Sequence, residues 1–342
     1  MTKKLSVISI FLLFAALLWL KVGRSAEESN IVVAKKVTKG PVLDGKVEAL
    51  WQQAKAIKIP LAGGANLPNG STEVTLRAVY TDTDIYFLAQ WRDQTQSYQR
   101  FPWKKQADGS WSQLKDPNDK GNDSNKYYED KLAILWNINI AGFESAGCMV
   151  ACHAGESGKP FGNKYTANPG ELGDLWHWKS VRTGPVGQID DQYVDSTRYD
   201  KDKAAEAGRK SDPKTAGGYN DNINDAKTGP KWAAKGNKPA PPYWILDSEK
   251  EAVDASKYKP GDEVAGIVIA PLVGDRGDIS AKASWSKGVW TLEFSRRLKT
   301  GSQYDVQFDD LTKAYAFGVA VFDNAQVRHA FAATPNKVVF GK

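Results

Sequence analysis

The sequence VTLRAVYTDTDIYFLAQW at residues 74–91 gives the clearest indication of the fold. Residues 74–80 alternate roughly between apolar and polar side chains, and residues 82–84 read Asp-Thr-Asp. Residues 85–91 form a second run, rich in aromatic and branched side chains. Two such runs joined by a short polar turn predict a β-hairpin.

Shorter strand-like runs lie on both sides of this hairpin. They are residues 57–59, 131–140, 263–270, 280–286, 289–295, 314–322 and 337–340, and residues 47–54 have the pattern of a short helix. Many short strands with Gly- and Asp-rich turns predict a mainly β chain folded as a β-sandwich. Residues 92–127 and 195–260 are rich in Lys, Asp, Gly, Asn and Pro. We expect these two segments to be long inserted loops rather than sheet.

The N-terminus has the pattern of a secretory signal. Residues 1–26 begin with two lysines, continue with an apolar run from Leu5 to Leu20 and end in small residues, so cleavage after Ala26 is expected. An uncleaved membrane anchor is the alternative, although a mostly apolar run of sixteen residues is shorter than the roughly 20 that span a bilayer. We therefore expect residues 27–342 to be exported to the periplasm, with membrane association if the segment is retained.

The charge of the chain comes largely from this N-terminal segment. Residues 1–26 hold four of the 46 Lys and Arg residues and none of the 40 Asp and Glu residues, so removing them lowers the net charge from +6 to +2. The remaining chain has no block of basic residues of the kind that binds nucleic acid. Nucleic-acid binding is therefore excluded from the interpretation.

The strongest chemical signal is CMVACH at residues 148–153, which holds both cysteines of the chain. Two cysteines followed directly by histidine are typical of c-type haem attachment, in which the cysteines form thioethers and the histidine binds iron. The usual gap is two residues, whereas Cys148 and Cys152 are separated by three, so the attachment loop must bulge. A Cys148–Cys152 disulfide and a zinc site that includes His153 are the alternatives.

The second axial ligand of a six-coordinate iron has to come from elsewhere in the chain. Met149, the one methionine outside residues 1–26, lies inside the attachment loop and does not easily reach the opposite face. The remaining histidines are His177 and His329, and a lysine is a further alternative. If residues 175–179 form a strand, Trp176 and Trp178 share one face and His177 points to the other.

Several motifs, taken in order, resemble the ethylbenzene-dehydrogenase-type haem-binding domain. They are PVLDG at 41–45, Trp51, VY at 79–80, IYF at 85–87, WRD at 91–93, GDLWHWK at 173–179, GVWTLEFSR at 288–296 and FGVAVFD at 317–323. The resemblance covers roughly residues 38–342 apart from the long loops. It implies a β-sandwich similar to some carbohydrate-binding modules.

The resemblance also implies a role. In this family the domain is the haem-bearing γ subunit of periplasmic molybdenum enzymes similar to dimethyl-sulfoxide reductase, such as selenate reductase or nitrite oxidoreductase. Family members with b-type haem use methionine and lysine as axial ligands. Here His153 falls about where that methionine is expected and His329 about where the lysine is expected, which implies a c-type variant with His329 as the second ligand and His177 in reserve.

The sequence thus predicts a periplasmic c-type cytochrome with one covalent haem and no catalytic site of its own. It is expected to relay electrons between the iron–sulfur subunit of a molybdenum oxidoreductase and a soluble cytochrome c. Lys164, Tyr165, Trp176 and Trp178 are expected as pocket walls or partners of the haem propionates. A stand-alone periplasmic cytochrome and a sugar-binding module without haem are the alternative functions.

Overall fold

The computed structural model describes residues 30–121, 123–153 and 164–341. The predicted signal segment, residues 1–26, lies outside the described residues. Within the described part of the chain, no helix is long and apolar enough to cross a membrane.

Strands dominate the described chain. They are β1 (Ile31–Lys36), β2 (Ile57–Ala62), β3 (Ser71–Tyr80), β4 (Asp84–Arg92), β5 (Trp103–Lys105), β6 (Trp111–Gln113), β7 (Lys131–Asn137), β8 (Gly173–Lys179), β9 (Asp190–Val194), β10 (Arg209–Ser211), β11 (Ala216–Asp221), β12 (Trp232–Ala234), β13 (Ile245–Leu246), β14 (Lys250–Ala252), β15 (Glu263–Val264), β16 (Ile267–Val273), β17 (Ser280–Ser286), β18 (Val289–Arg297), β19 (Tyr315–Phe322), β20 (Ala330–Phe331) and β21 (Asn336–Gly341). The helices are short: α2 (Phe143–Ala146) and the 3-10 helices η1 (Ala49–Gln53), η2 (Pro68–Gly70), η3 (Gly147–Val150), η4 (Gly184–Val186), η5 (Asp247–Glu249), η6 (Ala255–Lys257) and η7 (Asp275–Gly277).

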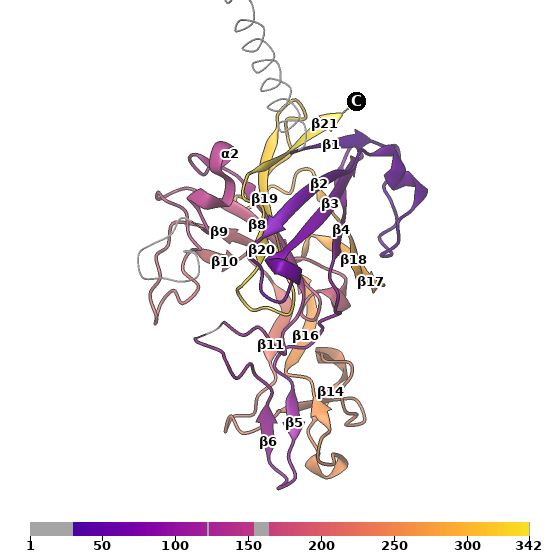
Figure 1. Cartoon of the computed structure of the whole chain (residues 1–342), viewed down its shortest axis with the longest axis vertical. Helices are drawn as coiled ribbons and strands as arrows, with labels where there is room; N and C mark the ends of the chain where they lie inside the picture. The colour runs from indigo at the N-terminus through magenta and orange to yellow at the C-terminus, as the bar shows by residue number, and fades with distance from the viewer. Residues whose placement is uncertain (1–29, 122, 154–163, 342) are drawn as a thin grey trace, which may run out of the picture.

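Thirteen of the strands form one sheet that folds back on itself. Its order is β10-β9-β8-β7-β19-β20-β2-β3-β4-β18-β17, and β1 and β21 add a second link between β19 and β3. Figure 1 shows β8 and β19 in one layer and β3, β4 and β18 in the other, and β7 pairs with both β8 and β19. Ring contacts cross between the layers: Phe87 of β4 lies 5.9 Å from Trp176 of β8, and Trp91 lies 6.0 Å from Trp178. The predicted mainly β fold and the β-sandwich are confirmed.

The hairpin at residues 74–91 forms as predicted. β3 and β4 pair antiparallel with Val74 opposite Trp91 and Tyr80 opposite Ile85. Val74, Leu76 and Ala78 point into the core of the sandwich, which is the period-2 burial that the alternating pattern indicated. The predicted short helix at residues 47–54 corresponds to η1.

The expectation that residues 92–127 and 195–260 are long loops rather than sheet was wrong. These segments contain β5, β6 and β10 to β14, and most of them gather below the sandwich in Figure 1. There, β5 pairs with β15, β11 and β13 pair with β16, and β12 pairs with β14. Trp103, Ile245, Tyr258 and Val264 form a separate hydrophobic cluster. Strands of two or three residues are too short to show a periodic pattern, so their composition resembles that of loops.

Candidate functional site

The outer face of the sheet at β19, β7 and β8 is an apolar floor, with small residues along β19. Along β19, Phe317, Val319 and Val321 point into the sandwich core, so Gly318 and Ala320 face outward. Ala320 pairs with Ala133 of β7. The result is a shallow apolar surface on the main sheet.

The segment with both cysteines lies on this floor. An ideal Cβ on Gly318 would meet the Cys148 Sγ at 2.2 Å, so this thiol rests directly against the backbone of β19. The carbonyl of Cys148 accepts hydrogen bonds from the N–H of Ala151 (3.2 Å) and of His153 (2.9 Å). One wide turn therefore absorbs the third residue between the cysteines and returns His153 to the side of Cys148.

The two cysteines are free thiols, so the structure does not contain the disulfide considered above. Burial raises the pKa of both thiols, that of Cys152 to about 11. Both sulfur atoms therefore carry their protons near neutral pH and pack as apolar groups beside Val150 and Ala320.

His153 and His329 face each other above this floor. Their Nε2 atoms lie 3.2 Å apart. The Nδ1–H of His329 donates to the carbonyl of Val327 at 2.7 Å, which leaves the lone pair on Nε2. The ring of His153 stacks on Phe331 of β20, with 3.9 Å between ring centroids and 15° between planes. The structure thus brings together two histidines that are 176 residues apart in the chain.

Burial keeps both imidazoles neutral. It lowers the pKa of His153, and together with the neighbouring His153 it lowers the pKa of His329 to about 3. Neutral imidazole is the form that binds a metal ion. Across the described ranges, no cysteine or histidine belongs to a group of three metal-ligand atoms within 4.8 Å of one another. This arrangement gives no support to the zinc alternative, which needs four ligands.

His177 lies one ring away from the histidine pair. Its ring stacks on Phe322 at 5.6 Å, and Phe322 in turn contacts His329 at 4.6 Å. Its Nδ1 lies 3.2 Å from the Oε1 of Gln192, and its Nε2 is buried without a hydrogen-bond partner. Phe322 also carries the ammonium group of Lys131 over its ring at 3.9 Å. His177 and Lys131 therefore border the site behind Phe322.

The expectation that Trp176 and Trp178 form pocket walls was wrong. Both side chains are 0–1% exposed and belong to the core between the sheets. The alternation along β8 that turns His177 outward turns both tryptophans inward, where Trp176 meets Phe87 and Trp178 meets Trp91.

Lys164 and Tyr165 already have partners in the structure. The Nζ of Lys164 forms an ion pair with the Oε2 of Glu206 at 2.7 Å. The guanidinium of Arg198 lies 3.8 Å from the ring centroid of Tyr165. Their contact with haem propionates stays a prediction, and for Lys164 it requires the ion pair with Glu206 to open or to be shared.

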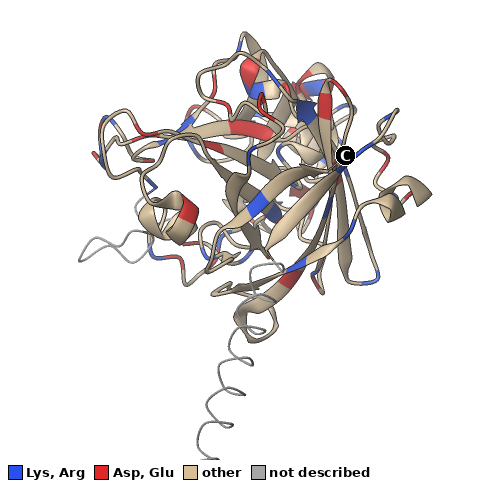
Figure 2. Cartoon of the chain, turned by 90° about the horizontal axis from the view of Figure 1, so that it is seen from above, with Lys and Arg blue, Asp and Glu red and all other residues tan. Residues whose placement is uncertain are grey.

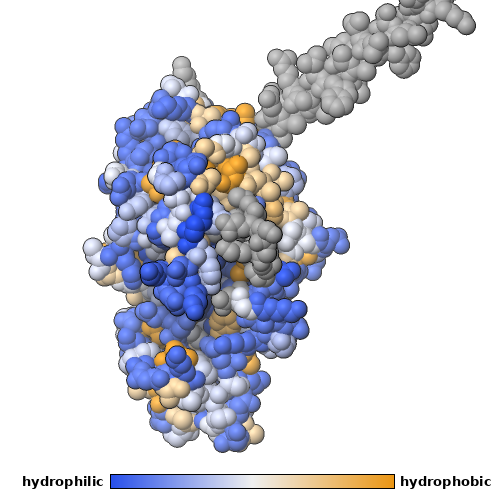
Figure 3. Space-filling view, turned by 90° about the vertical axis from the view of Figure 1, so that its left-hand side faces the viewer, coloured by the Kyte–Doolittle hydropathy of each residue, from blue (hydrophilic) through white to orange (hydrophobic). Residues whose placement is uncertain are grey.

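Sequence reasoning missed the supporting residues Gly318, Ala320, Phe322 and Phe331. A signal for the floor was present: small residues occupy alternate positions of an otherwise large-residue strand at 316, 318 and 320. Figure 3 views the side of the molecule that carries α2, and apolar surface gathers in its upper half. In Figure 2, basic and acidic segments are interspersed, with no block of one sign in that view.

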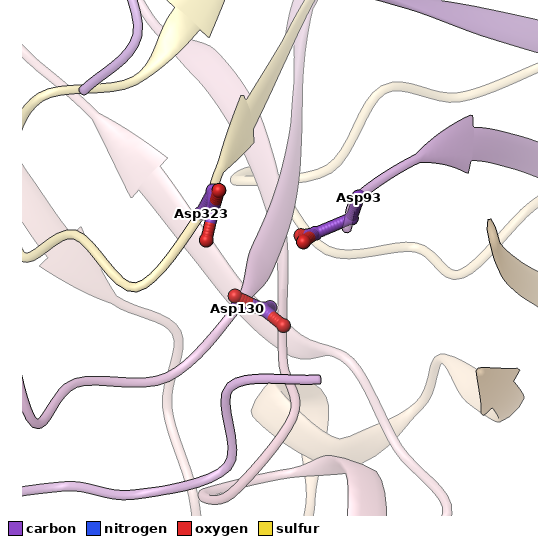
Figure 4. A group of neighbouring side chains, drawn as sticks. All are labelled: Asp93, Asp130 and Asp323. Carbon is purple, nitrogen blue, oxygen red and sulfur yellow. The ribbon is translucent and has the colours of Figure 1, made fainter. Parts of the chain in front are cut away.

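A cluster of three buried aspartates at the end of β19 was also missed. Asp93 follows β4, Asp130 precedes β7 and Asp323 follows β19, and their carboxylates point toward one another (Figure 4). Asp130 accepts hydrogen bonds from the N–H of Ser97 (2.7 Å) and the indole N–H of Trp290 (3.1 Å). Burial and the charge of Asp323 raise the pKa of Asp93 to about 7. The cluster therefore holds a proton near neutral pH.

The solved structures found to be similar contain β-sandwich modules. Two are a carbohydrate-binding module of family 9 from Caldicellulosiruptor kristjanssonii. In complex with glucose it has 9% identity, covers 90% of this chain and 94% of that chain, and gives a TM-score of 0.35. In complex with cellotriose the values are 10%, 91%, 93% and 0.35. A putative carbohydrate-binding protein from Bacteroides uniformis has 10% identity, coverage of 91% and 99%, and a TM-score of 0.37.

Sequence comparison identifies the family. No curated protein matches the chain. A family profile described as ethylbenzene dehydrogenase matches residues 48–333. These residues span most of the sandwich and the lobe below it, which is formed from residues 92–127 and 195–260. The chain therefore belongs to the ethylbenzene dehydrogenase family.

Proposed function

We propose that this chain is an electron-transfer protein that carries one c-type haem, with thioethers to Cys148 and Cys152 and iron bound by His153 and His329. The observation that carries the proposal is the pair of Nε2 atoms 3.2 Å apart next to two free thiols. Both cysteines pack with Ala320 on the outer face of the sheet, and His153 directly follows Cys152 in the chain.

The donor set fits such a haem. His153 and His329 would hold the iron through their Nε2 atoms, which lie 3.2 Å apart and would have to separate to admit the haem. Both imidazoles are held neutral by burial, and the Nδ1–H of His329 is already bound to the carbonyl of Val327. That hydrogen bond sets the tautomer and the ring orientation, as a partner of a metal-bound histidine usually does.

The haem would supply the one-electron chemistry, and the residues of this chain would tune it. Two histidines in place of the methionine and lysine that the resemblance implies favour a lower reduction potential than a methionine-ligated haem. The apolar rings of Phe322 and Phe331 cover part of the histidine pair. Because a charged iron is less favourable beside apolar groups, this cover would act on the potential as well.

Family membership supports association with a molybdenum enzyme complex. Within it we propose the role of a γ subunit, which passes electrons between an iron–sulfur subunit and a soluble cytochrome c in the periplasm. The lobe formed from residues 92–127 and 195–260 is our proposed contact surface for the other subunits. This part of the proposal rests on the family rather than on a feature of the site.

The test is expression of the full chain in a host that attaches c-type haem. We expect a pyridine haemochrome spectrum of the c type, and haem that stays with the polypeptide after acid–acetone extraction. The double variant Cys148→Ser/Cys152→Ser should lose covalent haem. Met149→Leu, a change at an exposed residue of the same loop, should retain it.

The other outcomes identify the competing functions. Haem that is extracted from the native chain would make the site b-type. Colourless protein that binds a glycan would favour the sugar-binding alternative. If native purification returns a haem-bearing monomer without molybdenum-enzyme subunits, the stand-alone cytochrome replaces the γ-subunit role while the haem proposal stands.

A further inference from the structure

A second group of aspartates lies at the other side of the sheet, where β8, β9, the end of β10, η7 and the segment before β19 meet. Its members are Asp174, Asp191, Asp212, Asp275, Asp278 and Asp305. Asp174 and Asp191 are fully buried, and Asp212 and Asp305 are each 3% exposed. Burying a charge is costly unless the charge is paired or coordinates a metal ion. These buried carboxylates therefore require a cation or protons to neutralise them.

One half of the group is neutralised by Arg296. Its Nη1 lies 2.8 Å from the Oδ2 of Asp174 and 3.5 Å from the carboxylates of Asp191 and Asp305. The three acidic neighbours raise the pKa of this fully buried guanidinium. Asp174, Asp191 and Asp305 thus share one fixed cation.

In the other half, Asp305 has Arg296 at 3.5 Å, but Asp212 and Asp275 have no such partner among the described residues. Asp212, Asp275 and Asp305 each offer a carboxylate oxygen, and these atoms lie within 4.8 Å of one another. Among the described residues, no lysine or arginine forms an ion pair with Asp212 or Asp275; the neighbouring Arg276 binds Asp190 instead. Both oxygens of Asp212 and both oxygens of Asp305 are buried without a hydrogen-bond donor.

The aspartate cluster of Figure 4 does not have this shortage of hydrogen-bond donors. There, backbone and indole N–H groups bind both oxygens of Asp130, and Asp93 Oδ2 is the one buried carboxylate oxygen of that trio without a donor. A single proton shared between Asp93 and a neighbour satisfies that cluster. Asp212 and Asp305 instead have four buried oxygens without a hydrogen-bond donor, and Arg296 lies near only one of them, the Oδ2 of Asp305. One shared proton leaves the others unsatisfied.

We propose that Asp212, Asp275 and Asp305 bind a calcium ion. Calcium takes six to eight oxygen ligands in flexible geometry and accepts bidentate carboxylates, whereas magnesium requires near-ideal octahedral geometry and keeps several waters. A site whose side-chain ligands are all carboxylates, two of them almost fully buried, suits calcium better.

The ion would join three separate parts of the chain. Asp212 directly follows β10, Asp275 begins η7 and Asp305 lies between β18 and β19. It would therefore stabilise the edge of the sheet at which β9 and β10 lie, independently of haem binding. The test can be made on the haem-bearing full chain because its readouts are calcium content and thermal stability.

Elemental analysis of the purified full chain should find about one calcium per chain. EGTA treatment should lower Tm by roughly 5 °C, the shift expected when an ion at about 100-fold excess over Kd is removed. Added Ca²⁺ should restore Tm, and the same concentration of Mg²⁺ should not. Asp212→Asn should abolish both the bound calcium and the EGTA response, while Asp93→Asn, a buried carboxylate in the other cluster, should keep both.

Three outcomes would overturn the proposal. Native protein without calcium and without an EGTA response would mean that the carboxylates share protons. Calcium bound equally by Asp212→Asn would place the ion elsewhere. A response to Mg²⁺ as large as that to Ca²⁺ would reject calcium selectivity. If Asp212→Asn does not fold, elemental analysis of the native chain and Asp275→Asn, at a less buried position, decide the question.

Discussion

Replacing Gly318 by alanine tests whether the attachment loop must rest directly on β19. The added methyl would meet the Cys148 Sγ at 2.2 Å, more than 1 Å closer than ordinary van der Waals contact. Gly318 is the middle of a paired strand, opposite Leu135, so the strand cannot withdraw without breaking the ladder. The loop carrying Cys148 has to move instead.

The size of the effect follows from this overlap. Forcing one extra methyl into a well-packed contact costs about 1–3 kcal/mol. If that cost falls on the position of the loop against β19, the ratio of seated to unseated loop decreases roughly fivefold to hundredfold, since about 1.4 kcal/mol is a factor of ten. The proposed attachment at Cys148 needs the seated loop. The yield of c-type haem per chain should therefore fall as well, by at least severalfold.

The assay is haem per polypeptide after denaturing electrophoresis, measured in parallel with Tm. Gly184→Ala is the matched control, because a methyl there meets its nearest neighbour at 3.4 Å, and its haem yield should equal that of the native chain. A Gly318→Ala variant with native haem yield and native Tm would refute the reasoning, because it would show that the cysteine loop does not rest on β19 when haem is attached.

Three further predictions concern other parts of the molecule. His329→Ala should keep covalent haem but give a high-spin spectrum and rapid carbon monoxide binding, while His177→Ala stays low-spin; low-spin spectra in both variants would point to a lysine ligand. The pKa of Asp93 is raised to about 7 from an ordinary value near 3.9. The folded state is therefore stabilised by protonated Asp93 fully below about pH 4, and this stabilisation is lost as pH rises through about 7. The urea midpoint should therefore fall between pH 5 and pH 8, and Asp93→Asn should reduce that fall; an equal fall in the variant would reject the assignment. Arg296→Leu leaves Asp174 buried without its cation and should destabilise the fold by about 3–5 kcal/mol, measured as a loss in urea midpoint that a surface Lys→Leu control does not show.

The regular part of the fold could be predicted because its strands are long enough to alternate. β17 spans Ser280–Ser286, the range that the pattern around Lys287-Gly288 indicated, and β18 extends the predicted range by two residues. The predicted strand at 263–270 is instead split at Gly266, where a Cβ would meet the carbonyl of Phe101 at 2.1 Å. Nothing in a single sequence shows that a distant backbone segment will approach so closely.

The candidate site divides in the same way. Cys148, Cys152 and His153 are neighbours in the chain, so their spacing alone indicates their chemistry. His329 was predicted as the second ligand from the family resemblance, and only the fold places its Nε2 near that of His153. Trp176 was misassigned because an aromatic residue next to a histidine has the same appearance whether it faces a cofactor or the core. The two aspartate clusters have no local signature, since each is assembled from at least three distant segments.

The arrangement around β20 explains why His329, rather than His177, is suited to oppose His153. His329 directly precedes β20, and the ring of His153 stacks on Phe331 at the end of that strand. β20 pairs with both β19 and β2. Both imidazoles are therefore positioned by the same paired strand of the sandwich. His177 reaches His329 only through Phe322, and its Nδ1 faces Gln192. A rigid element keeps the side chains that it carries in place, so both imidazoles would keep their positions in the proposed electron carrier.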